Sequence, residues 1–292
     1  MHNLASFILC TFTYYKENIM KKYIFTDLAC EVDNEKDTQT KIISEAIKRI
    51  TAFEYKRDKK IRHTVFFSPK LWQLNDNDFI LLNNAVSEEL GDIIRENIDI
   101  NLDNGFSALV VGLGNPHLTS DSLGAEAVKK ITVMRKRKNV SVYAVTPDVM
   151  GNTGIDTVDV IRAYVGLVRP SVVIAVDALM AKSYKRLAST VQISDGGITP
   201  GGGLGAERQE LSINTVGVPV ISIGVPMAVN SSTMIAEALI KGGMNNIPDG
   251  ISALLKNGLD FFVTPKEADI AVQSAALLIS SSIDLALSGF YR

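Results

Sequence analysis

Two aspartates stand where a catalytic pair is expected. Asp177 directly follows the apolar run 172–176, and Asp121 follows the run 108–111 after a glycine-containing turn. Active sites of open parallel sheets lie at the carboxyl ends of the strands, so both side chains are expected at one edge of such a sheet. Two carboxylates in one crevice repel each other, which raises the proton affinity of one of them. The pair then supplies an acid and a base that can activate water, as in aspartic proteolysis.

Each aspartate also has a purely structural interpretation. Aspartate is a good N-cap residue, and Asp121 precedes a helical pattern that begins at Ser122. Asp177 could cap the following helix in the same way. Residue type alone favours capping, and one side chain can do both, so the pattern by itself leaves the two roles open.

Two groups of glycines could have either a binding role or a structural role. Gly112 and Gly114 open like a dinucleotide-binding motif, but the third glycine of G-x-G-x-x-G is missing. The second group is Gly201, Gly202 and Gly203, which follows no strand and opens no helix. This context favours a closely packed or flexible loop over a phosphate-binding loop.

The sequence offers few residues for other catalytic mechanisms. The chain has three histidines, His2, His63 and His117, so a Ser–His or Cys–His pair has few candidates. His117 is expected to be a loop residue. The sequence contains no G-x-S-x-G, H-E-x-x-H or Walker motif. We therefore expect neither a cofactor nor a bound metal ion.

Composition and charge set further limits. Hydrophobic residues make up 46% of the chain and charged residues 21%, which excludes a disordered or fibrous protein. The net charge of −2 gives no electrostatic reason to expect direct nucleic-acid binding, and the basic run 135–138 is assigned to a helix C-terminus. The two cysteines form no C-x-x-C pair, which suits a reducing cytoplasm. No apolar run reaches the ~18 residues that span a bilayer, and no signal peptide is expected.

The positions of the apolar residues indicate an α/β fold, a mostly parallel sheet with helices on both faces. Short apolar runs predict strands at 64–67, 108–111, 142–145, 172–176 and 220–223. Helical spacing predicts helices at 42–50, 81–94, 123–134, 158–168, 233–240 and 266–287, with a loop at 242–250. One α/β domain is expected to cover residues 28–292.

Six blocks of sequence resemble the signature of the germination protease family. They occur in the family's order and cover the chain from about residue 23 onward. Each block alone is weak evidence for the family, but six blocks in order are strong evidence. The blocks are Thr26–Ala29, Val111–Gly124, Val149–Ile155, Val173–Leu179, Gly217–Pro226 and Val263–Asp269.

The resemblance implies an endopeptidase that degrades small acid-soluble spore proteins when a bacterial spore germinates. The family's two essential aspartates fall on Asp121 and Asp177. The resemblance also implies a fold like that of hydrogenase-maturation proteases and phosphorylases, a homotetramer, and a place in the cytoplasm of the forespore or spore core. Neither a membrane nor a direct nucleic-acid partner is implied.

The resemblance further implies a zymogen that removes its own N-terminus. The family cuts after an acidic residue within Thr-Glu, an apolar residue and Ala, and Thr26–Ala29 repeats that pattern. We therefore expect a cut between Asp27 and Leu28, with residues 1–27 as extension and propeptide. The plain alternative is that both are ordinary residues of a first strand. The loop of Gly201, Gly202 and Gly203 is expected beside the aspartates, where it would let a substrate strand approach closely.

The chain departs from the family pattern in ways that bear on substrate preference and activity. Thr199 and Gly202 replace a histidine and a serine, and Met227 and Asn230 replace a threonine and an aspartate. Two alternatives follow. One is a hydrogenase-maturation-type endopeptidase, which needs histidine among its metal ligands, and the other is a non-catalytic spore protein that only binds its target. A peptidyl-tRNA hydrolase is disfavoured because its downstream Thr-Arg-His-Asn run is missing.

Overall fold

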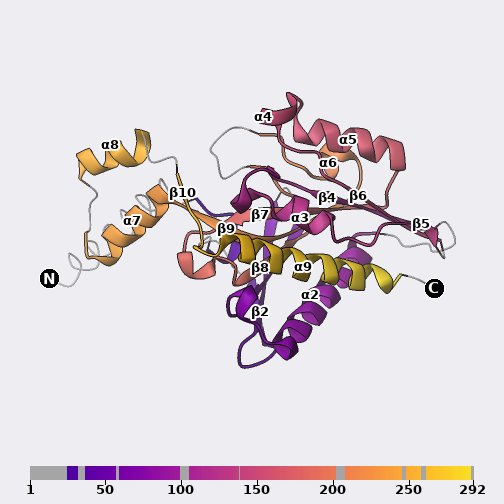
Figure 1. Cartoon of the computed structure of the whole chain (residues 1–292), viewed down its shortest axis with the longest axis horizontal. Helices are drawn as coiled ribbons and strands as arrows, with labels where there is room; N and C mark the ends of the chain where they lie inside the picture. The colour runs from indigo at the N-terminus through magenta and orange to yellow at the C-terminus, as the bar shows by residue number, and fades with distance from the viewer. Residues whose placement is uncertain are drawn as a thin grey trace.

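Ten strands form a single sheet in this computed structural model, which describes residues 25–31, 37–56, 59–98, 105–137, 139–201, 208–244, 248–257 and 261–290. The strand order is β1-β2-β3-β8-β9-β7-β4-β6-β5, and β10 pairs with β9 (Figure 1). The strands are β1 (Asp37–Ile42), β2 (Lys48–Lys56), β3 (Lys59–Phe67), β4 (Phe106–Gly112), β5 (Met134–Arg137), β6 (Val140–Val145), β7 (Val172–Met180), β8 (Thr190–Ser194), β9 (Val220–Asn230) and β10 (Phe262–Val263).

The centre of the sheet is parallel and its flanks are antiparallel. Strands β6, β4, β7 and β9 are parallel neighbours and contain four of the predicted apolar runs. Strands β1, β2, β3 and β8 extend one side in antiparallel pairs, and β5 closes the other side. The α/β class is confirmed, and the sheet is mixed rather than mostly parallel, because an apolar run does not reveal the direction of its neighbours.

Helices cover both faces of the sheet (Figure 1). Along β4 the side chains of Ala108 and Val110 join one core, and those of Leu109 and Val111 join another on the opposite face. This alternation is the two-residue period of a strand that is buried on both sides. The helices are α2 (Asp76–Asn97), α3 (Leu123–Val128), α4 (Met150–Thr153), α5 (Thr157–Val168), α6 (Ile213–Val216), α7 (Ser231–Lys241), α8 (Asp249–Asn257) and α9 (Ala268–Ser288).

Four predicted helices are confirmed as α2, α5, α7 and α9. Helix α9 is long and apolar enough to cross a membrane by length and composition, and no other helix in the described ranges is. It packs against α2 and α3, and Val272, Leu278 and Ile283 lie in the main core. These are the contacts of a core helix.

The predicted helix at 42–50 is wrong. The segment is a turn between β1 and β2, which pair as an antiparallel hairpin. The Ser44 hydroxyl accepts hydrogen bonds from the backbone N–H of Ala46 and Ile47, which stabilises the turn. Ile47 is buried while Ile42 is 76% exposed, so the isoleucines do not share one face. Pairing of β2 with β3 outweighs the helical spacing.

The predicted helix at 123–134 is also too long. Helix α3 ends at Val128, and Met134 begins the edge strand β5. The basic residues 135–137 therefore lie on an edge strand rather than at a helix C-terminus, and Lys138 lies outside the described residues. Arg135 is exposed, and positive charge on a strand edge disfavours pairing with another chain. The predicted loop at 242–250 is confirmed for 242–244, and α8 begins at Asp249.

Two glycines allow the loop after β4 to pack directly on the central strands. A Cβ at Gly124 would lie 2.5 Å from the carbonyl oxygen of Val176 in β7 and would also collide with the backbone of Leu113. A Cβ at Gly112 would lie 2.5 Å from the carbonyl carbon of Gly124. These contacts fix the distance between β4, β7 and the start of α3, and so they position the residues that follow the two strands.

We expect Gly124→Ala to lower the free energy of unfolding by about 1–3 kcal/mol, since the methyl group would push backbone atoms apart. Chemical denaturation measures the change. Gly166→Ala is the control, because Gly166 lies exposed in α5 with no atom near its absent Cβ. Alanine there should raise the free energy of unfolding by roughly 1 kcal/mol through helix propensity. Equal effects of the two substitutions would contradict the packing role of Gly124.

Candidate active site

Asp177 lies within β7 and not after its end, which corrects the predicted boundary. The strand continues to Met180, so Asp177 cannot cap a helix. Only 6% of the residue is exposed, and Oδ1 accepts a hydrogen bond of 2.9 Å from the backbone N–H of Ala178. Gly224 of β9 is its register partner, and a Cβ there would lie 2.5 Å from the Asp177 carbonyl oxygen. Glycine at that position therefore allows β9 to lie against the main chain of Asp177 and the side chain of Leu179.

Asp121 ends a short 3-10 helix, η4 (Thr119–Asp121), on the loop after β4. Its Oδ2 accepts a hydrogen bond of 2.7 Å from the backbone N–H of Asn115. The N-cap of α3 is Ser122, so Asp121 does not cap that helix. Gly114 has a φ of +91°, and a Cβ there would lie 2.8 Å from Asp121 Oδ1. The glycine-containing turn therefore bends around the carboxylate, which explains the Gly-x-Gly pattern without a nucleotide.

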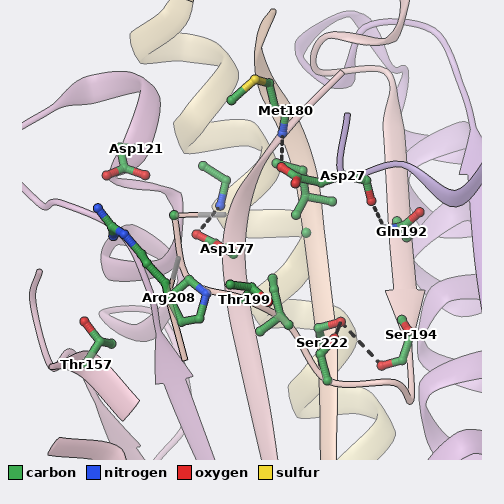
Figure 2. Close-up of a pocket in the computed structure, with 18 of the residues that line it drawn as sticks. Asp27, Asp121, Thr157, Asp177, Met180, Gln192, Ser194, Thr199, Arg208 and Ser222 are labelled. Carbon is green, nitrogen blue, oxygen red and sulfur yellow. Dashed lines mark hydrogen bonds between the residues drawn. The ribbon is translucent and has the colours of Figure 1, made fainter. Parts of the chain in front are cut away.

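The two aspartates line one pocket of about 560 Å³ (Figure 2). Asp121 reaches it from the loop after β4 and Asp177 from β7, the parallel neighbour of β4. Figure 2 shows the guanidinium group of Arg208 extending toward Asp121. The predicted meeting of the two carboxylates at the carboxyl ends of the central strands agrees with this arrangement.

The surroundings of the two carboxyl groups differ. Burial raises the pKa of Asp177 well above the ordinary value of 3.8, and the negative charges of Asp121 and Asp27 raise it further. Burial also raises the pKa of Asp121, but the Asn115 N–H and the positive charge of Arg208 act in the opposite direction. The pair can therefore share one proton unequally, with Asp177 protonated while Asp121 is ionised.

The predicted cleavage segment forms part of the same pocket wall. The Asp27 backbone N–H donates to the Met180 carbonyl at 2.9 Å, and the Met180 N–H donates to Asp27 Oδ2 at 2.7 Å (Figure 2). Asp27 as a whole residue is exposed, yet the protein packed around its carboxyl group raises its pKa through desolvation, against the opposing effect of the Met180 N–H. Leu28 is fully buried in a small apolar cluster with Leu179, Ala181, Leu187 and Val229.

An acidic side chain anchors the other end of this segment. Glu31 Oε1 and Oε2 accept hydrogen bonds of 3.1 and 2.6 Å from the backbone N–H groups of Ser183 and Lys182, respectively. Its Oε2 also accepts 2.7 Å from the hydroxyl of Thr26. The segment from Thr26 to Glu31 is thus attached at one end to Met180, the last residue of β7, and at the other to Lys182 and Ser183, which follow it.

The predicted glycine loop is described only at its start. Gly201 lines the pocket with a φ of +62°, and a Cβ there would collide with the guanidinium group of Arg208. Gly202 and Gly203 lie outside the described residues. Glycine at 201 therefore leaves space for the cation beside Asp121, a role that the sequence did not suggest.

Several pocket residues had no sequence signal. Arg208, Met180 and Gln192 are far apart in the chain and belong to no recognisable motif. His117 is confirmed as an exposed loop residue. His63 lines the pocket, and burial lowers its pKa. Among the residues with described positions, no group of three or more His, Cys, Asp or Glu side chains is arranged to hold a metal ion.

Known proteins are similar to this sequence over most of its length. The Germination protease family model matches residues 17–241. A germination protease from Clostridium acetobutylicum is 34% identical over 263 residues, which cover 79% of this chain and 80% of that protein. Another from Caldanaerobacter subterraneus is 36% identical over 241 residues, which cover 70% of this chain and 73% of that protein.

Among solved structures, a NiFe hydrogenase maturation protease from Thermococcus kodakarensis covers 67% of this chain and 98% of its own, with 15% identity and a TM-score of 0.35. A likeness at that level carries no argument about fold or function. The similarity in sequence to the two germination proteases is much higher, because identity exceeds 30% over most of both chains in each comparison. The chain therefore belongs to the germination protease family.

Proposed function

We propose that this protease hydrolyses small acid-soluble spore proteins during germination, with Asp121 as base and Asp177 as acid. The observation that carries the proposal is the unequal environment of two carboxyl groups in one pocket. Water is the nucleophile. We expect the mechanism to need no cofactor, because the two acids supply both proton transfers.

The reaction follows from the protonation states. Ionised Asp121 accepts a proton from water while the water oxygen adds to the carbonyl carbon of the substrate peptide. The proton on Asp177 then passes to the leaving nitrogen, the C–N bond breaks, and an acid and an amine result. Asp121 is left protonated and Asp177 ionised, and exchange of the proton with solvent restores the starting state. The higher pKa of Asp177 makes that restoration favourable.

Two of the departures from the family pattern lie away from the two aspartates. Met227 is buried in the core, and Asn230 caps α7 by accepting hydrogen bonds from Ser232 and Thr233. Neither lines the pocket, whereas Thr199 does. These positions favour an active protease over a protein that only binds its target. Among the departures that the structure describes, Thr199 is the one placed to change substrate preference, and Gly202 lies outside the described residues. The homotetramer and the spore-core location remain predictions from the family.

Self-processing is supported by where the segment lies. Thr26–Ala29 lies at the wall of the pocket that contains both aspartates, and Asp27 is near enough to raise the pKa of Asp177. The main-chain hydrogen bond from Asp27 to Met180 of β7 is the kind of contact through which a peptide binds along a strand. We propose that the segment is cut between Asp27 and Leu28, which removes residues 1–27.

Asp121→Asn and Asp177→Asn should each reduce digestion of a purified small acid-soluble spore protein by about 10²–10⁴-fold, because each removes one proton carrier. Gel analysis of fragments over time gives the rate, and circular dichroism checks the fold. Asp92→Asn is the matched control, since Asp92 is exposed on α2 and pairs with Arg95. A folded variant of either pocket aspartate with activity within threefold of wild type would contradict the assignment.

The raised pKa of Asp177 predicts a pH effect on stability. The folded state binds this proton more tightly than the unfolded state, so the stabilisation is complete below pH 3.8 and is lost as pH rises through the folded pKa. The free energy of unfolding should therefore fall with rising pH, and it should fall less in Asp177→Asn. Urea unfolding across this pH range measures both curves. Parallel curves would show that Asp177 is not the buried acid that titrates.

Mass spectrometry of protein kept under mildly acidic, dehydrating conditions should find a new N-terminus at Leu28. Asp177→Asn should stay whole under the same conditions, because the cut uses the same acid. The aspartate before the cut, where the family's substrates have glutamate, should make this reaction slower than digestion of spore proteins. An intact N-terminus in protein that digests spore proteins would count against the zymogen proposal.

A further inference from the structure

The side chain of Gln192 makes two hydrogen bonds to the segment that contains the proposed cut. Its Nε2 donates to the carbonyl oxygen of Asp27 at 2.8 Å, a bond drawn in Figure 2. Its Oε1 accepts from the backbone N–H of Ala29 at 2.7 Å. These two main-chain groups flank Leu28, and Ala29 begins the short 3-10 helix η1 (Ala29–Glu31). The amide thus contacts the main chain on both sides of Leu28.

The contacts also fix which way the amide points. An N–H group must face the carbonyl of Asp27 and the oxygen must face the N–H of Ala29, so the opposite orientation would lose both bonds. The backbone of Gln192 is held on both sides, because β8 lies between β3 and β9. Only 8% of the residue is exposed. The donor is therefore fixed in place before any reaction occurs.

We propose that Gln192 positions and polarises the carbonyl group of the peptide bond that is cut, both in the chain's own segment and in substrates. The inference rests on the proposed function, since it takes Asp27–Leu28 as the cleaved bond. When water adds to the Asp27 carbonyl carbon, the carbonyl oxygen gains negative charge, and the Nε2–H bond to it becomes stronger. When the C–N bond breaks, the carbonyl re-forms and Leu28 leaves with the proton from Asp177. Water is the only co-reactant.

The flanking contacts play a different part. Met180, Lys182 and Ser183 hold Asp27 and Glu31 through main-chain groups. They secure the segment on both sides of the cut and are independent of side-chain identity at those three positions. Gln192 contacts the carbonyl oxygen of the cut bond through its side chain, so substitution can remove this contact and leave the others in place.

The test is the first-order rate of self-cleavage of the full chain, followed by mass spectrometry. Gln192→Leu keeps the side chain's approximate size but has no donor, and the rate should fall about 10²–10³-fold, as when one oxyanion donor is lost. Thr190→Val is the matched control. It lies on the same strand and face, is fully buried, and its hydroxyl has no hydrogen-bond partner in the described part of the chain. Its rate should match wild type.

Gln192→Glu separates a chemical role from a structural one. A carboxyl group can donate to the Asp27 carbonyl only while it is protonated, so the ratio of this variant's rate to that of wild type should rise as pH falls. A residue needed only for packing would give a ratio that does not depend on pH. This variant also decides the matter if Gln192→Leu fails to fold.

The outcomes distinguish the two proposals. If the wild-type chain neither cuts itself nor digests a purified spore protein, the proposed function fails, and the role of Gln192 fails with it. If wild type is cut and folded Gln192→Leu is cut at an equal rate, only the role of Gln192 is overturned. A pH-independent ratio for Gln192→Glu would overturn that role as well.

Discussion

The site depends on a carboxyl group buried inside a β-sheet beside other negative charges. Ionisation of Asp177 would create a negative charge that water cannot solvate and that lies near Asp121 and Asp27. Both effects favour the protonated form. Asp121 experiences the same desolvation but has a main-chain donor and a nearby guanidinium group. The pKa of Asp177 is therefore raised further than that of Asp121, and the proposed hydrolysis through water rests on that difference.

The fold supports this arrangement mainly with glycine and main-chain groups. Gly114 leaves the space in which the Asp121 carboxylate lies, Gly224 allows β9 to approach the main chain of Asp177, and Gly124 lets the loop after β4 pack on β7. Backbone N–H groups of Asn115 and Ala178 are the donors to the two carboxylates. Main-chain donors have no rotamer freedom and do not titrate, so they fix the carboxylates without adding charges that would neutralise the pair.

The segment around Asp27 is held against the pocket by both main-chain and side-chain groups. It is bound at Asp27 by Met180, the last residue of β7, and at Glu31 by main-chain groups that follow β7, and its apolar residue, Leu28, enters a small buried cluster. While Asp27 lies there, its charge adds to the repulsion on Asp177. The occupant of the pocket and the protonation of the acid are therefore coupled by simple electrostatics.

The sequence alone determined the α/β class, the central strands, four of the helices and the family. These features depend on local patterns: apolar runs, helical spacing and short motifs around Asp121 and Asp177. The hairpin at 42–50 could not be predicted, because its isoleucines have helical spacing and only pairing with β3 decides the outcome. The same limit applies to the end of α3, where Met134 joins a strand.

Only the tertiary structure decided what surrounds each aspartate. Asp177 is buried within β7 by segments that are distant from it in the chain. The guanidinium group of Arg208 lies beside Asp121, and the amide of Gln192 contacts Asp27, and both are contacts between distant residues. Residue type gives the ordinary pKa of a carboxyl group, but its shift depends on desolvation and neighbouring charges. The sequence could therefore name the two candidate acids, whereas the packing of the sheet decided which of their pKa values is raised further.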